Sequence, residues 1–114
     1  MQSIAEVWKD IQGYEGLYQV SNLGRIQNSK GRILKFEYSN KGYACVHLCK
    51  DGKSKKFRVH RLVAQAFIPN PDALPEVNHK NLDKSDNKSS NLEWCDRKYN
   101  VRYGEFIIPP DEFV

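Results

Sequence analysis

The stretches Glu76-Val77-Asn78-His79 and Asn91-Leu92-Glu93-Trp94-Cys95 lie close together in the second half of the chain. Each contains a short run that predicts a strand, and a polar stretch separates the two. Asp96 is a suitable N-cap for a helix that runs through Tyr103 and ends at Gly104. The residues therefore predict a ββα unit, with strands over 76–79 and 92–95, a polar loop over 80–91 and a final helix.

This unit would bring polar side chains together around one histidine. Asn78 and His79 put an amide oxygen beside an imidazole, and His79 on the first strand would face Asn100 on the helix. Asn91 follows His79 by twelve residues, and Asn100 follows Asn91 by nine. Such a set suits the activation of water next to a weakly held divalent cation, so we interpret it as a nuclease site. Taken alone, His79 would more simply be a surface histidine beside a turn.

The segment before this unit changes its period at His60. Apolar residues between positions 62 and 67 share one helical face, and Pro69 and Pro71 prevent the helix from continuing. Upstream, short alternating segments joined by Gly-containing turns predict an antiparallel β meander. Asp51-Gly52 marks a hairpin between its last two strands. The strands are expected at 17–21, 25–28, 33–36, 43–49 and 55–59.

The predicted fold class is α+β, with three parts along the chain. An N-terminal β meander occupies residues 1–58, the helix and the ββα unit occupy residues 59–104, and an acidic tail occupies residues 105–114. A chain of 114 residues with 39% hydrophobic residues makes one domain, or two very small ones that share a core. No apolar run approaches the length of a membrane span, and no leader is evident, so we expect a soluble, cytoplasmic protein with reduced cysteines.

Positive charge is concentrated in the middle of the chain. The net charge is +4, but residues 25–61 contain eleven Lys or Arg residues against Glu37 and Asp51. This basic segment, interleaved with aromatic residues, suits a phosphate backbone. A solvated face on an ordinary basic protein is the alternative. The candidate phosphate contacts are Arg25, Lys30, Arg32, Lys55, Lys56, Arg58 and Arg61.

Two parts of the chain resemble known families. Residues 59–71, 77–79, 91–95 and 100–102 resemble, in that order, the HNH endonucleases of phage and intron homing elements. Residues 8–26 resemble the nuclease-associated modular domain that precedes the HNH motif. The resemblance implies a ββα-metal (His-Me finger) fold and one divalent metal ion, Mg²⁺ or Mn²⁺.

The resemblance also implies roles for the four polar residues. His79 matches the general base, and Asn78 and Asn100 match the metal ligands. Asn91 matches the asparagine that braces the loop and orients the imidazole.

Two departures from the family pattern affect these expectations. Asn78 stands where aspartate is more familiar and brings no negative charge, so the metal would bind weakly without substrate phosphate. Asn81-Leu82-Asp83 stands where an Asp-Gly-Asn turn is usual. Since leucine adopts positive φ at a higher cost than glycine, we expect this loop to turn differently. Asp83 or Asp86 is a candidate for the missing carboxylate, although solvated loop charges are the simpler interpretation.

The sequence thus predicts a metal-dependent endonuclease that nicks double-stranded DNA, as a monomer or a homodimer. The alternative is a catalytically decayed DNA-binding module with a regulatory or packaging role. A third interpretation, a zinc-stabilised RNA-binding domain, rests on Cys45, His47 and Cys49, which share one face of a predicted strand. Their spacing lacks the CxxC turns that are usual in structural zinc sites.

Overall fold

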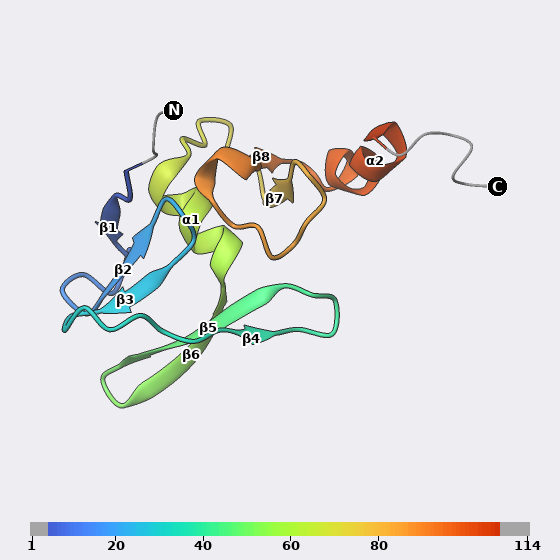
Figure 1. The fold of residues 1–114 in the computed structure, drawn as a ribbon. Coiled ribbons are helices and arrows are strands. Elements are labelled where there is room, and N and C mark those ends of the chain that lie inside the picture. Colours follow the sequence, from blue (N-terminus) through green and yellow to red (C-terminus); the bar gives the residue numbers. More distant parts are fainter. Residues whose placement is uncertain (1–4, 108–114) are drawn as a thin grey trace.

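The computed structural model describes residues 5–107, which form three small antiparallel sheets around one helix (Figure 1). The first sheet contains β1 (Trp8–Asp10), β2 (Tyr18–Ser21) and β3 (Ile26–Asn28). The second contains β4 (Glu37–Tyr38), β5 (Ala44–Lys50) and β6 (Lys53–Arg58), and leads directly into α1 (Val59–Phe67). The third pairs β7 (Glu76–His79) with β8 (Leu92–Cys95), which follows a 3₁₀ turn, η1 (Ser89–Asn91). The last helix is α2 (Arg97–Ile107).

The predicted meander is divided between two sheets. The strand expected over 33–36 is wrong, because only Ile33 pairs there, in a single bridge with Gln27. Leu34 and Phe36 instead pack against the core while the chain crosses from the first sheet to the second. The hairpin at Asp51-Gly52 is confirmed: both residues have positive φ, 53° and 74°, as a two-residue turn of type I′ requires.

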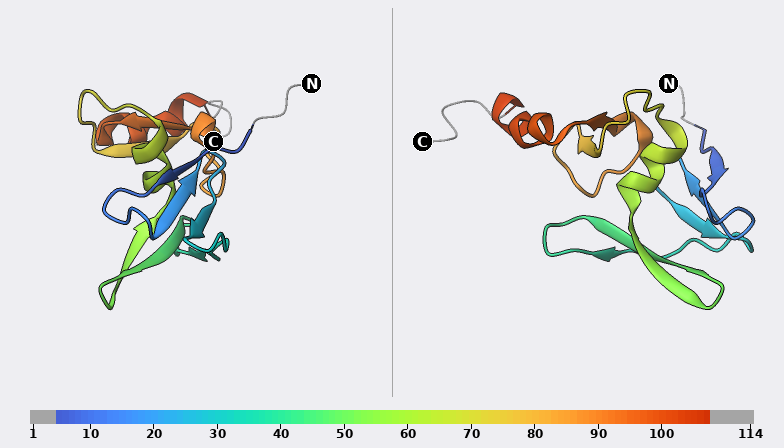
Figure 2. Two further views of the ribbon diagram at one scale, coloured as in Figure 1. Left: turned by 90° about the vertical axis from the view of Figure 1, so that its left-hand side faces the viewer. Right: turned by 180° about the vertical axis from the view of Figure 1, so that it is seen from behind.

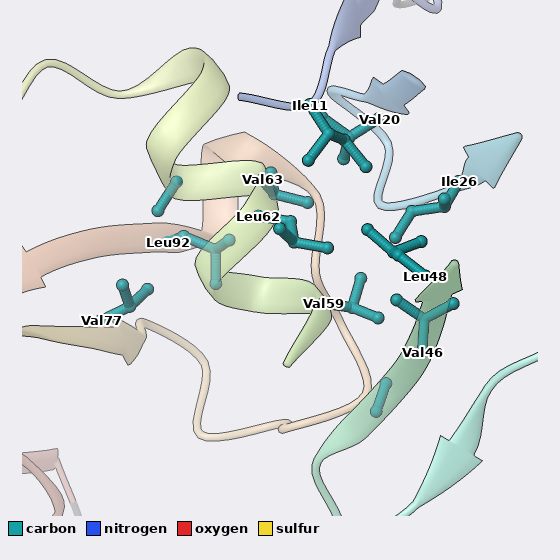
Figure 3. Packing of buried hydrophobic residues seen from close by; sticks show 12 residues of the cluster. Ile11, Val20, Ile26, Val46, Leu48, Val59, Leu62, Val63, Val77 and Leu92 are labelled. Carbon is teal, nitrogen blue, oxygen red and sulfur yellow. The ribbon is translucent and has the colours of Figure 1, made fainter. Parts of the chain in front are cut away.

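One hydrophobic core joins all three sheets to α1 (Figure 3). Val20 comes from the first sheet, Leu48 from the second and Leu92 from the third, and they gather around Val59 and Val63 on α1. Burial of this apolar surface is the main force that stabilises the chain. Because the cluster draws on residues from both 1–58 and 59–104, the two predicted segments share a core.

The ββα unit forms where the sequence predicts it. β7 and β8 have the predicted bounds and pair antiparallel, with Asn78 opposite Glu93 and His79 opposite Leu92. The backbone N–H of Tyr99 donates to Oδ1 of Asp96 at 2.7 Å, which is the N-cap interaction expected for α2.

The predicted end of the last helix is wrong, because α2 continues past Gly104 to Ile107. Glycine ends a helix where its backbone turns left-handed, but a helix interior also tolerates glycine, at a cost of about 1 kcal/mol. Residues 108–114 of the expected tail lie outside the described residues. Figure 2 shows α2 at the end of the molecule far from the first sheet. Neither described helix is long and apolar enough to cross a membrane.

Candidate active site

A hollow of about 330 Å³ lies between β7, the loop that follows it and α2. Its lining brings together three of the four predicted site residues, Asn78, His79 and Asn100. Tyr43, which precedes β5, and Lys84, from the loop after β7, line it as well. The second sheet therefore contributes to the same hollow as the ββα unit.

The imidazole of His79 is buried and held by a hydrogen bond. Its Nε2 lies 2.8 Å from Oδ1 of Asn87, which is also buried. An amide oxygen can only accept, so Nε2 carries the hydrogen and Nδ1 is the nitrogen able to take up a proton. Burial lowers the pKa of His79 from its ordinary value, although the bond to Asn87 opposes this shift. The ring is thus neutral at neutral pH and available as a base.

Asn91 braces the loop between β7 and β8. Its Oδ1 accepts from the backbone N–H of Asn81 at 3.1 Å, and its Nδ2 donates to Oδ1 of Asn81 and to the carbonyl of Asp86, both at 2.9 Å. The direct contact to the imidazole comes from Asn87 and not from Asn91, whose bonds hold the loop that carries Asn87. Asn87 is one of several asparagines in a polar stretch, and no spacing in the sequence distinguishes it.

The amides of Asn78 and Asn100 are each held on one side. Nδ2 of Asn78 donates to Oε1 of Glu93 at 2.9 Å, and Nδ2 of Asn100 donates to Oε1 of Glu76 at 3.0 Å. Neither amide oxygen has a hydrogen-bond partner among the described residues, and such oxygens are suitable ligands for a hard cation. Across residues 5–107, no three His, Cys, Asp or Glu side chains are grouped as a metal site. The donor set therefore fits a hard divalent cation, held weakly because neither amide carries a charge.

The sequence led us to expect that the loop after His79 avoids the glycine-like turn, and this expectation is wrong. Leu82 adopts φ 66°, the left-handed conformation that a glycine would take, and its N–H donates to the carbonyl of His79 at 3.0 Å. This backbone costs a leucine about 1–2 kcal/mol. The carboxylate of Asp83 accepts from Ser85, and that of Asp86 accepts from Asn81. Both aspartates are therefore engaged in contacts within the loop.

Among the predicted phosphate contacts, Arg58 packs on Tyr43, which lines the hollow. Its guanidinium carbon is 4.4 Å from the centre of the Tyr43 ring, and Nζ of Lys84 is 4.8 Å from the same centre. Lys84 was missed because the sequence places it well outside the basic segment. Arg25 forms an ion pair with Glu6 instead.

The other candidates, apart from Arg61, are dispersed over the surface. Arg61 donates to the carbonyl of Pro75 at 3.0 Å. Lys55 lies over the ring of Phe57, and Lys56 is exposed on the same strand, β6. Lys30 and Arg32 are exposed in the turn after β3. The structure therefore places Arg58 and Lys84 on Tyr43. Arg61 lines a neighbouring hollow together with Arg58 and Asn100, and the remaining candidates lie apart.

The ring of His60 packs against the ring of His79. The two ring centres are 5.0 Å apart, and Tyr43 packs against His60 at 5.2 Å. Nδ1 of His60 is buried and has no hydrogen-bond partner among the described residues. Burial lowers the pKa of His60 to about 3, and the nearby His79 adds to this effect. His60 is therefore a neutral packing residue at neutral pH.

The zinc interpretation receives no support from this geometry. Cys45 is buried, Cys49 is exposed, and His47 contacts the carboxylate of Glu37 at 3.1 Å. These three side chains are not grouped as a metal site.

Comparison with known proteins agrees with this arrangement. Residues 6–49 match the NUMOD4 motif, and residues 57–102 match an HNH endonuclease family model. The chain carries a NUMOD4 segment followed by an HNH endonuclease segment. Its HNH segment contains all four predicted site residues and most of the hollow's lining. Its NUMOD4 segment contains the first sheet, most of β5 and Tyr43, which also lines the hollow.

Relatives of this HNH chain come from viruses. The DNA endonuclease I-HmuI of Bacillus phage SP01 is 47% identical over 95 residues, which are 82% of this chain and 55% of the relative. An uncharacterized HNH endonuclease of Acanthamoeba polyphaga mimivirus is 48% identical over 97 residues, 84% of this chain and 29% of the relative.

A solved structure gives the same result for the fold. It describes DNA binding and cleavage by the HNH homing endonuclease I-HmuI, and matches with a TM-score of 0.79 and 40% identity. The match covers 94% of this chain and 63% of that one. The HNH chain spans from about a quarter to just over half of the curated relatives that it matches.

Proposed function

We propose that this HNH chain is a metal-dependent DNA endonuclease that hydrolyses one phosphodiester bond and so nicks a DNA duplex. The observation that carries the proposal is the pairing of His79 with Asn87, beside the amides of Asn78 and Asn100. It provides a base of fixed tautomer next to two oxygen ligands for a hard cation. The description of I-HmuI as a DNA endonuclease supports the same activity.

The residues divide the chemistry between them. Nδ1 of His79 takes a proton from water, which attacks the phosphorus as the 3′ oxygen leaves. When bound, Mg²⁺ or Mn²⁺ would neutralise charge on the scissile phosphate and on the leaving oxygen. Asn78 and Asn100 would hold that ion through Oδ1, and Asn91 keeps the loop in place.

The partner that we propose is double-stranded DNA. Arg58 and Lys84 stand against Tyr43 at the edge of the hollow, where cations can contact backbone phosphates. One ββα site acts on one strand, so a monomer nicks, and a double-strand break requires a homodimer or two visits. We place this activity in the cytoplasm, where Cys45, Cys49 and Cys95 remain reduced thiols.

A second function, DNA binding without cleavage, is favoured by one feature. Asn78 carries no charge, so the metal site has fewer charged ligands than an aspartate would give it. Incubation of supercoiled plasmid with Mg²⁺, Mn²⁺ or EDTA separates the two functions. We expect nicked circles with either metal ion and none with EDTA. Retardation of the plasmid on a gel without any nicking would favour the binding module.

A further inference from the structure

Both amides that we assign to the metal ion are backed by carboxylates. Asn78 on β7 lies directly opposite Glu93 on β8, and their side chains are joined at 2.9 Å. Asn100 on α2 is joined to Glu76 at the start of β7, at 3.0 Å. Each ligand is therefore tied to a neighbouring element of the ββα unit.

The position of Glu93 is itself fixed. The same Oε1 that accepts from Asn78 also accepts from the hydroxyl of Tyr99 on α2, at 3.1 Å. Asn78 is buried, so water offers its amide few alternative hydrogen bonds. Glu93 thus links β7, β8 and α2 through one oxygen.

A carboxylate acceptor determines which way an amide faces. An ionised carboxylate only accepts, so the NH₂ group of the amide must face it and the carbonyl oxygen must face away. Without that partner the amide can rotate by half a turn and present NH₂, which cannot bind a cation. The contact is also charge-assisted, so negative charge lies directly behind each ligand.

We propose that Glu93 and Glu76 are positioning residues, which aim the amide oxygens of Asn78 and Asn100 at the metal ion and supply the negative charge that Asn78 lacks. This inference rests on the proposed function. It explains how two neutral amides serve a divalent cation, because the charge is placed one hydrogen bond away from the ligands.

The arrangement has a consequence for the aspartate that is more familiar at position 78. In Asn78→Asp, two carboxylates would meet where an amide now donates to a carboxylate, and their repulsion would disturb the site. Adding Glu93→Gln restores a donor facing an acceptor, with the charge moved from position 93 to position 78. The single change should therefore weaken metal binding, and the double change should restore it.

The test is titration of the full chain with Mn²⁺ alone. Electron paramagnetic resonance measures the concentration of free Mn²⁺ at each step. Glu93→Leu removes both charge and acceptor, and we expect affinity to fall about 10–100-fold. Glu93→Gln and Glu76→Gln keep an acceptor and should lose less. Glu37→Gln is the matched control, because it removes one carboxylate that contacts only His47 in the described structure. A melting curve for each variant verifies that it folds.

The outcomes separate this inference from the proposed function. Weakened Mn²⁺ binding in Glu93→Leu and in Asn78→Asp, with recovery in the double variant, supports the positioning role. Binding by Glu93→Leu that equals Glu37→Gln, or tighter binding by Asn78→Asp alone, overturns the positioning role and leaves the nuclease proposal standing. Absence of binding by the wild type at millimolar Mn²⁺ overturns the positioning role, and nicking of plasmid with Mn²⁺ then decides the nuclease proposal separately.

Discussion

Nε2 of His79 lies 2.8 Å from Oδ1 of Asn87, and both side chains are buried. This contact fixes the tautomer of the imidazole that we propose as the general base. Without it, the ring could turn or carry its hydrogen on Nδ1, and the nitrogen that accepts a proton would be lost.

Asn87→Ala should therefore slow nicking by about 10–100-fold, the size typical of a lost orienting contact. Asn87→Asp keeps an acceptor for Nε2 and should retain most of the rate. Single-turnover nicking of a supercoiled plasmid measures both variants, and gel retardation verifies that DNA binding is unchanged. An unaltered rate in Asn87→Ala would mean that other contacts hold the imidazole.

Gly24, in the turn between β2 and β3, lies against Asn87. A Cβ atom at Gly24 would come within 3.1 Å of the Asn87 backbone and Cβ, whereas one at Gly31 would meet nothing within 4 Å. The carbonyl of Asn22 in the same turn accepts from the N–H of Ser89 at 2.7 Å. The turn of the NUMOD4 segment thus supports the loop that holds the base.

Gly24→Ala should lower both stability and nicking. Gly24 and Gly31 have φ of 88° and 80°, so alanine at either position should cost about 1–2 kcal/mol of conformational strain. Only Gly24→Ala should also displace Asn87 and slow nicking. Urea denaturation and the plasmid assay compare the two variants. Equal losses of activity would show that the effect is one of stability alone.

Much of the ββα unit could be predicted from local sequence. The strands of β7 and β8 and the Asp96 cap depend on neighbouring residues, so their patterns are visible in the sequence. The hydrogen bond between His79 and Asn87 could not be predicted, because it depends on how the loop between them folds. Lys84 was missed for the same reason, since its contact with Tyr43 joins residues far apart in the chain.

Other errors arose where tertiary packing overrode local preference. The segment around Leu34 crosses between sheets because this path lets its apolar side chains pack against the core. Leu82 adopts a left-handed backbone that its residue type disfavours, held within a loop braced by Asn91. Neither outcome follows from the propensity of the residues themselves.

The stability of the chain should fall as the pH drops below about 6.5. His60 has an unfolded pKa near 6.5 and a folded pKa of about 3, so between these values the unfolded chain binds a proton that the folded chain excludes. This difference lowers stability by up to about 1.4 kcal/mol per pH unit as the pH falls. Arg58, Arg61 and His79 surround the ring, and the lowered pKa of His79 acts in the same direction.

His60→Leu tests this assignment, because it removes the His60 imidazole and leaves that of His79. Urea denaturation at pH 7 and at pH 5 should show a smaller loss of stability in the variant than in the wild type. The same loss in both proteins would place the titrating group elsewhere.

Lys84 should contribute to DNA binding, although it lies outside the basic segment. Lys84→Ala should weaken binding of duplex DNA and reduce the slope of log affinity against log salt by about 0.9, the value for one lost phosphate contact. Arg25→Gln is the comparison, because Arg25 is paired with Glu6 and should leave the slope unchanged. Fluorescence anisotropy at several salt concentrations measures both. A change of slope in Arg25→Gln alone would reverse the assignment.

The most direct test of the central claim is the single-turnover nicking rate of the wild type and of His79→Ala, with Mn²⁺ and with enzyme above the Kd of each protein. Our account predicts nicked circles from the wild type and a plasmid that stays supercoiled with His79→Ala, although both proteins retard it on a gel. Nicking by His79→Ala at the wild-type rate would contradict the assignment of His79 as the general base.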